Sequence, residues 1–178
     1  VKAEPGKRTY ATPGSGSSGH FASAQFTQLT RTSMNHIPYK GAAQAITDLM
    51  GGQVDSSFAT LGSVLPQVQS GKLTALAVAA PKRSALLPNV PTFEEVGVKG
   101  YAADAWYGLL APASTPPAVL ATLRRVATEF TQAPATREKL RSLGMEAQNT
   151  CSEAFGAQLA QEVKLYGELA RALDLKTE

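Results

Sequence analysis

ATPGSGSSGH, residues 11–20, is the stretch that decides the fold of this chain. The strand-like run 7–11 leads into it, and apolar residues recur at helical spacing over 21–29. Glycine permits the backbone conformations and the close approach that a tight turn needs, and Ser17 or Ser18 can cap the helix. Because the first turn of a helix has free N–H groups and the positive end of the dipole, this strand–loop–helix unit predicts an anion-binding site.

The loop glycines Gly14, Gly16 and Gly19 also match the dinucleotide-binding pattern G-x-G-x-x-G. That pattern requires an acidic residue about twenty positions further on, where it binds a ribose hydroxyl. The corresponding place holds Pro-Tyr-Lys at residues 38–40, which contains no acid. A nucleotide-dependent enzyme that uses this loop is therefore the alternative hypothesis, and a fluorescence assay for NAD or NADP binding discriminates it from a binding protein.

Strand and helix patterns alternate after the first unit. Residues 33–39 and 54–59 read as strands, each followed by a helix. The apolar run 73–79 is typical of a strand buried in a parallel sheet, and residues 101–110 also read as a strand. This alternation predicts an α/β fold with a mainly parallel sheet flanked by helices.

The last third of the chain is predicted to be helical without intervening strands. Helices are expected over residues 116–131, 134–143 and 152–173. The first and last of these carry apolar stripes, so both need another surface to pack on.

Composition excludes several classes of function. The chain has 178 residues and a formal net charge of +3, and its basic residues are scattered rather than interleaved with aromatics, so no nucleic-acid partner is expected. No apolar run reaches the roughly eighteen residues of a membrane span. The single cysteine, Cys151, rules out an internal disulfide framework, and the few dispersed His and Cys residues predict no metal site.

Few residues qualify as acid–base catalysts. His20, His36 and Asp55 are the candidates, because such catalysis needs a His, Asp or Glu whose pKa is tuned by its neighbours. For the histidines, packing or hydrogen bonding is the commoner role, and for Asp55 it is a turn or cap. We therefore expect no catalytic residue and no cofactor, and we do not expect the chain to be an enzyme.

Three junctions share one plan of strand, small-residue loop and helix start. They lie at residues 14–20, 39–43 and 59–63. In a parallel sheet all three fall at the carboxyl ends of the strands, where open α/β sheets bind ligands. Converging helix N-termini with backbone and hydroxyl donors predict a site for a small anion, most simply a carboxylate.

Several motifs in a fixed order carry a resemblance to a known family. They are TPGSGSSGH at 12–20, HIPYKGA at 36–42, LMGGQVD at 49–55, GKL at 71–73, ALAV at 75–78, LPNVPT at 87–92 and YGLLAP at 107–112. Over essentially its whole length the chain resembles the Bug family, the substrate-binding proteins of tripartite tricarboxylate transporters. The resemblance implies a two-lobed, periplasmic-binding-protein-like receptor that captures a small di- or tricarboxylate in the periplasm for the membrane components of such a transporter.

The same resemblance implies the domain organisation. Family members carry a further N-terminal portion with a signal peptide, so the chain reads as a fragment that lacks it. Residues 1–103 then correspond to the ligand-binding second lobe. Residues 104–178 correspond to a crossover strand and the C-terminal helices of the first, incomplete lobe. Because these helices would pack against the missing portion, we expect the truncated chain to self-associate.

The resemblance also supplies candidate ligand-binding residues. In the family, main-chain and hydroxyl donors of the second lobe hold one carboxylate of the ligand. The matching positions are Ser17, Ser18, Gly19, Lys40, Gly41, Ala42 and Thr60, and His20 is added to them because it lies in the first turn of the first helix. Many relatives have Asp after the Phe that matches Phe58, whereas this chain has Ala59, so a carboxylate without an amino group is favoured.

Overall fold

The computed structural model of the chain describes residues 1–101 and 103–172. The described residues divide into two compact units, one formed by those of 1–105 together with 165–172, the other by residues 106–164. Each unit is considered by itself below. No helix in the described residues is long and apolar enough to cross a membrane.

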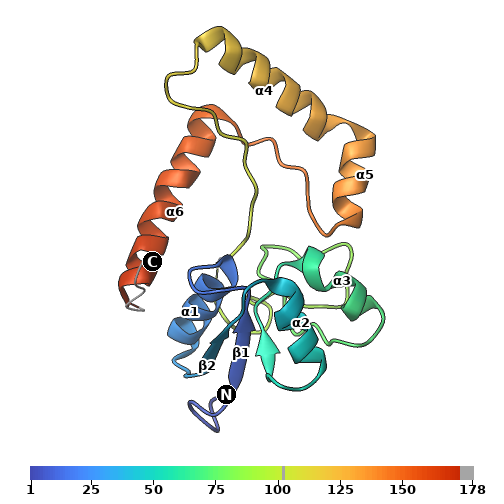
Figure 1. The fold of residues 1–178 in the computed structure, drawn as a ribbon, viewed down its shortest axis with the longest axis vertical. Helices are drawn as coiled ribbons and strands as arrows, with labels where there is room; N and C mark the ends of the chain where they lie inside the picture. The colour runs from blue at the N-terminus through green and yellow to red at the C-terminus, as the bar shows by residue number, and fades with distance from the viewer. Residues whose placement is uncertain (102, 173–178) are drawn as a thin grey trace. The chain divides into compact units, whose positions relative to one another are not determined.

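The first unit is built on a three-stranded parallel sheet (Figure 1). Its strands β1 (Thr9–Thr12), β2 (Asn35–Pro38) and β3 (Ser56–Ser57) lie in the order β2-β1-β3. The helices α1 (Ser18–Thr30), α2 (Ala42–Met50) and α3 (Leu61–Gln69) each follow one strand. The predicted α/β fold with a parallel sheet and flanking helices is confirmed.

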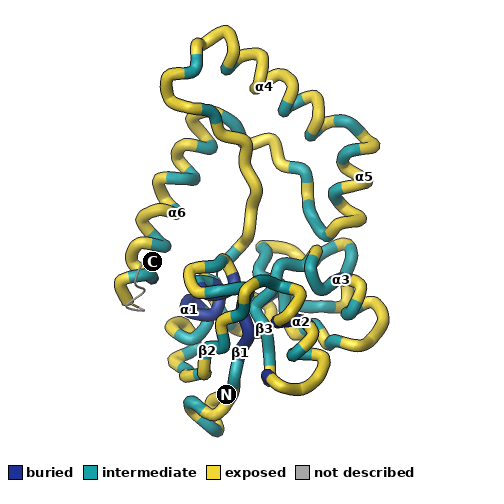
Figure 2. The backbone as a smooth tube through the Cα atoms, in the orientation of Figure 1, coloured by how far each residue is buried: buried dark blue, intermediate teal, exposed yellow. Residues whose placement is uncertain are grey.

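The core of this unit surrounds the central strand, as the dark blue segments of Figure 2 show. Ala11 of β1 packs with Ala45 and Val54, and the partly buried Ile37 and Leu49 close that cluster.

Aromatic rings form a second series of contacts. Tyr10 contacts Phe58, Phe58 contacts Phe26, Phe26 contacts Phe93 and Phe93 contacts Tyr101. These contacts connect the sheet with α1 and with the chain that follows α3.

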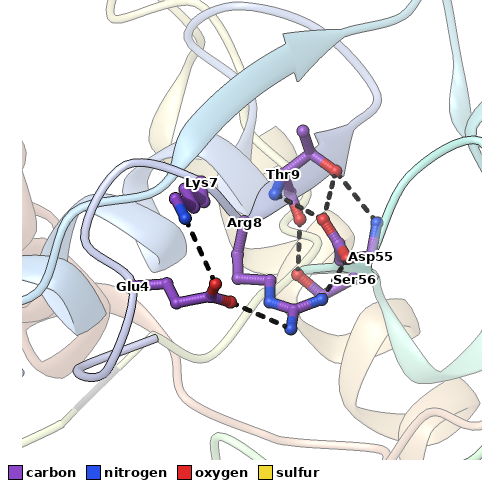
Figure 3. Close-up of polar contacts among 6 residues, drawn as sticks. All are labelled: Glu4, Lys7, Arg8, Thr9, Asp55 and Ser56. Atoms are coloured by element: carbon purple, nitrogen blue, oxygen red, sulfur yellow. Dashed lines mark hydrogen bonds and ion pairs between the residues drawn. The ribbon is translucent and has the colours of Figure 1, made fainter.

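The amino ends of β1 and β3 are joined by a polar network centred on Asp55 (Figure 3). Its carboxylate accepts hydrogen bonds from the Thr9 N–H and hydroxyl, each at 2.8 Å, and from the Arg8 guanidinium at 2.9 Å. The Ser56 hydroxyl donates to the Thr9 carbonyl at 3.0 Å. Asp55 therefore links two strands and does not have the turn or cap role that was expected for it.

Two predicted strands, at 73–79 and 101–110, are wrong. In the first run Val78 alone makes a bridge, to Thr92, and Leu76 is 75 % exposed. In the second, the described residues form no strand and Tyr107 is 81 % exposed. An apolar run becomes a strand only where a neighbour supplies a hydrogen-bonding partner, and the sheet in the described residues ends at the two-residue β3.

The three C-terminal helices are present as predicted. They are α4 (Pro117–Gln132), α5 (Pro134–Ser142) and α6 (Ser152–Ala172), and residue 173, where α6 was expected to end, lies outside the described residues. Neither α4 nor α5 has a buried residue. Within the second unit, Trp106 packs edge-on against Phe155 of α6 at 5.2 Å and donates a hydrogen bond to Glu162 at 2.6 Å.

Candidate ligand-binding site

The carboxyl ends of the three parallel strands lie at one edge of the sheet, and a helix starts after each of them. None of the helices α1, α2 and α3 has an acidic residue in its first turn. Each helix start therefore presents N–H groups and the positive end of a dipole without a side-chain carboxylate of its own first turn to neutralise them. This edge has the electrostatic character that an anion requires.

At the first junction, Ser17 is the N-cap of α1. The sequence predicts Ser17 or Ser18 as the cap, and the first of these two alternatives is confirmed. Its hydroxyl accepts from the His20 N–H at 3.3 Å and donates to the Gly14 carbonyl at 2.7 Å. The Ser18 side chain is exposed, and the amides of Ser18 and Gly19 have no partner within residues 1–101 and 103–172. Ser17 thus holds the loop, whereas Ser18 offers free donors.

The second junction is bonded directly to the first. The Gly41 N–H donates to the Pro13 carbonyl at 2.9 Å, and the Tyr39 N–H donates to the Thr12 carbonyl at 3.0 Å. Gly41 has φ of +128°, a conformation essentially reserved for glycine. Its neighbours in the chain complete the junction: Lys40 is exposed, and Ala42 is the first residue of α2.

The third junction touches the first through Gly19. This glycine is buried, and a Cβ placed on it would collide with the Phe58 carbonyl oxygen. Thr60 is the N-cap of α3, and its hydroxyl donates to the Ser63 hydroxyl at 3.3 Å, which itself donates to the Thr60 carbonyl at 2.7 Å. The structure therefore places the first predicted junction and the residues next to it against both of the others.

Both histidines lie beside the first junction. His20 is 6 % exposed, its ring stacks on His36 at 4.0 Å, and its Nδ1 accepts from the Gly16 N–H at 3.2 Å. Burial lowers the pKa of His20, and burial together with the neighbouring His20 lowers the pKa of His36 to about 4. Two neutral imidazoles in packed, hydrogen-bonded positions fit the structural roles expected for them.

The third acid–base candidate is remote from these loops. Asp55 lies at the amino ends of β1 and β3, opposite to the strand ends from which α1 and α3 begin. Hydrogen bonds from Thr9 and Arg8 lower the pKa of Asp55 to about 2, so it is a carboxylate held in its charged form. The described residues contain no group of three or more His, Cys, Asp or Glu side chains that could hold a metal ion.

Two features of the site were missed by sequence reasoning. Thr12 is fully buried, and its hydroxyl bonds to the Gly14 carbonyl at 3.1 Å and to His36 Nε2 at 2.7 Å. Gly19 serves helix–strand packing rather than only close approach of a ligand. The signal for Gly19 was present, because the third glycine of G-x-G-x-x-G has this packing role in the fold that defines the pattern.

The fold and the loop edge define an α/β protein of the periplasmic-binding-protein type. The receptor family of the tripartite tricarboxylate transporters matches residues 1–175, and the chain belongs to this family. The chain is 31 % identical over 175 residues to Protein BugT of Bordetella pertussis, covering 98 % of this chain and 54 % of that protein. The Bug-family resemblance is confirmed.

Two solved structures are similar throughout the chain. R. palustris Rpa4515 with adipate superimposes with a TM-score of 0.84 at 27 % identity, covering 96 % of this chain and 57 % of that one. MatC (Rpa3494) from Rhodopseudomonas palustris with bound malate gives a TM-score of 0.77 at 26 % identity, covering 95 % and 58 %. The chain therefore spans little more than half the length of these relatives.

Proposed function

We propose that the protein is an extracytoplasmic solute receptor that captures a small carboxylate for the membrane components of a tripartite tricarboxylate-type transporter. Membership of the receptor family carries this proposal. The loop edge supports it, because three helix starts without first-turn acids present donors to a negatively charged group. A receptor of this family works in the periplasm and not as an enzyme.

The ligand class follows from the chemistry of the edge and from the relatives. Adipate and malate, bound in the two similar structures, are both dicarboxylates. We propose that one carboxylate of such a ligand meets the Ser18 and Gly19 amides together with Ala42 and Lys40, and that Gly41, whose N–H bonds to the Pro13 carbonyl, shapes the loop beside them. Ser17, His20 and Thr60 shape the loops around them through the hydrogen bonds described above.

The lobe assignment is part of the same proposal. Residues 1–103 form the lobe that holds the carboxylate, and residues 104–178 belong to the crossover and helices of the other lobe. The parallel sheet and all three loop junctions fall inside the first of these ranges, which supports the assignment.

The direct test is a titration of the isotope-labelled chain with adipate, malate and succinate, observed by NMR. We expect chemical-shift changes that saturate and that concentrate on the amides of Ser18, Gly19 and Ala42.

Thermal unfolding provides a second measurement. A bound ligand stabilises the folded chain by RT ln(1 + [L]/Kd), which is about 2.7 kcal/mol at a hundredfold excess over Kd. Methylammonium chloride, a salt without a carboxylate, is the control at matched ionic strength. Absence of shifts with all three dicarboxylates contradicts the proposal, and saturable NAD binding at the loop supports the alternative.

Ala59 gives the ligand proposal a finer test. The family resemblance implies an Asp at this position in many relatives, whereas Ala59 has no carboxylate to offer a ligand amino group. Succinate is therefore expected to bind more tightly than aspartate. A clear preference for aspartate would contradict this part of the proposal.

A further inference from the structure

Three rings form a continuous stack beneath the first loop. His20 of α1 lies on His36 of β2 at 4.0 Å with an interplanar angle of 23°, and His36 lies on Tyr10 of β1 at 4.9 Å with an angle of 16°. His36 is the titratable group that stacks on His20 from the sheet, and Tyr10 stacks on His36. Within the described residues no carboxylate contributes to the pKa of either histidine. Both imidazoles are neutral near pH 7.

One ring nitrogen of each histidine is bonded to the first loop or to the residue that precedes it. His20 Nδ1 accepts from the Gly16 N–H at 3.2 Å. His36 Nε2 shares a 2.7 Å hydrogen bond with the Thr12 hydroxyl, which also contacts the Gly14 carbonyl at 3.1 Å. Since a neutral imidazole has one donor and one acceptor nitrogen, the use of Nδ1 as acceptor places the His20 proton on Nε2.

The loop has few other restraints between these points. Ser15 and Gly16 are exposed, and Gly16 has φ of +73°. The Ser17 hydroxyl and N–H both bond to the Gly14 carbonyl. Gly16 is therefore fixed chiefly by the histidine, only two residues before the free amide of Ser18.

We propose that His20 is a positioning residue, whose unprotonated Nδ1 fixes the Gly16 amide and so sets the course of the loop that presents the Ser18 and Gly19 donors. Protonation at Nδ1 converts the acceptor to a donor and releases Gly16. The ring acts through the loop and does not itself need to touch the ligand. The consequence for ligand capture rests on the proposed function, whereas the effect on Gly16 does not.

Two variants separate the acceptor from the ring. His20→Asn retains an acceptor oxygen near the Nδ1 position but loses the ring, and His20→Phe retains the ring on His36 but loses the acceptor. The measurement is the hydrogen-exchange rate of the Gly16 amide in the full 178-residue chain near pH 7. We expect exchange about tenfold faster in His20→Phe and within about threefold of wild type in His20→Asn. If His20 acted only as a packed ring, the Gly16 amide would exchange faster in His20→Asn than in His20→Phe. That result overturns the proposal.

The wild-type chain gives an independent measurement. The Gly16 amide resonance should shift together with the His20 ring as the pH falls below 6.5, and in His20→Asn this shift should be absent. A Gly16 resonance that does not follow the His20 ring overturns the proposal even if one variant fails to fold. Adipate titration of each variant then tests the consequence. If neither the wild-type chain nor any variant binds adipate, the proposed function is wrong. The Gly16 measurements decide the positioning role independently of that result.

Discussion

The α-carbon of Gly19, at the start of α1, lies against the carbonyl of Phe58, which follows β3. A Cβ at this position would touch Pro13 Cδ at 3.4 Å, an ordinary contact, so it is the Phe58 carbonyl that excludes side-chain atoms. The start of the first helix is thus packed directly on the backbone of a neighbouring junction. Gly19 couples the geometry of two proposed binding loops.

Gly19→Val is therefore expected to disturb the fold and not only ligand binding. Backbone must move to admit the side chain, at a cost of about 1–3 kcal/mol in the free energy of unfolding. Gly167→Ala in α6 is the matched control, because a Cβ there meets nothing within 4 Å and alanine favours a helix by about 0.5–1 kcal/mol. Urea unfolding followed by circular dichroism measures both. Equal stability of Gly19→Val and wild type would show that the junctions separate easily.

Ser17→Ala and Ser18→Ala are expected to act on different properties. Ser17 caps α1, so its removal should lower the free energy of unfolding by about 1 kcal/mol. Ser18 is exposed, so Ser18→Ala should leave stability unchanged and weaken carboxylate binding by about 1.5–3 kcal/mol, the value of a hydrogen bond to a charged group. Thermal unfolding with and without succinate measures both quantities. Tight binding by Ser18→Ala would remove its hydroxyl from the proposed site.

Most of the architecture could be predicted from local patterns, because each strand–loop–helix unit contains its own signals. Gly51 follows α2, Ser17 caps α1, and both features stand in the sequence. The run 73–79 could not be placed correctly, since its fate depends on whether a partner strand exists elsewhere. The roles of Thr12 and His36 depend on the register that sets Tyr10 opposite His36, and no spacing rule reveals that stack.

Stability is expected to fall as the pH is lowered from about 6.5 to about 4. The pKa of His36 is about 4 in the folded chain, below its ordinary value of 6.5, and the pKa of His20 is also lowered. The unfolded chain therefore binds more protons in this window, so acid favours unfolding, and the contribution is fully present above pH 6.5. Urea midpoints from pH 7 to pH 4 measure it. The double variant His20→Asn with His36→Gln should flatten the curve, and an unchanged slope would contradict the assignment.

Asp55 acts in a lower pH window. Its folded pKa of about 2 lies below its ordinary 3.8 because Thr9 and Arg8 bond to the charged form. Its contribution is present above about pH 4 and is lost as the pH falls toward 2. Asp55→Asn should be less stable than wild type at pH 7, and the difference should shrink toward pH 2. Glu4→Gln, which removes only exposed ion pairs, is the control expected to change little.

The 178-residue chain is expected to self-associate through the exposed apolar face of α4. Four of its side chains share one side of the helix at intervals of three and four residues and are each 38–59 % exposed: Val119, Leu123, Val126 and Phe130. Burial of such side chains favours association by about 1.5–3 kcal/mol each when it is complete. Light scattering at micromolar concentration should report a species larger than a monomer. Phe130→Glu should shift it toward the monomer, whereas Ala121→Glu, on the opposite side of α4, should not. A monomeric wild-type chain, or equal effects of the two substitutions, would show that this face is not the surface through which copies meet.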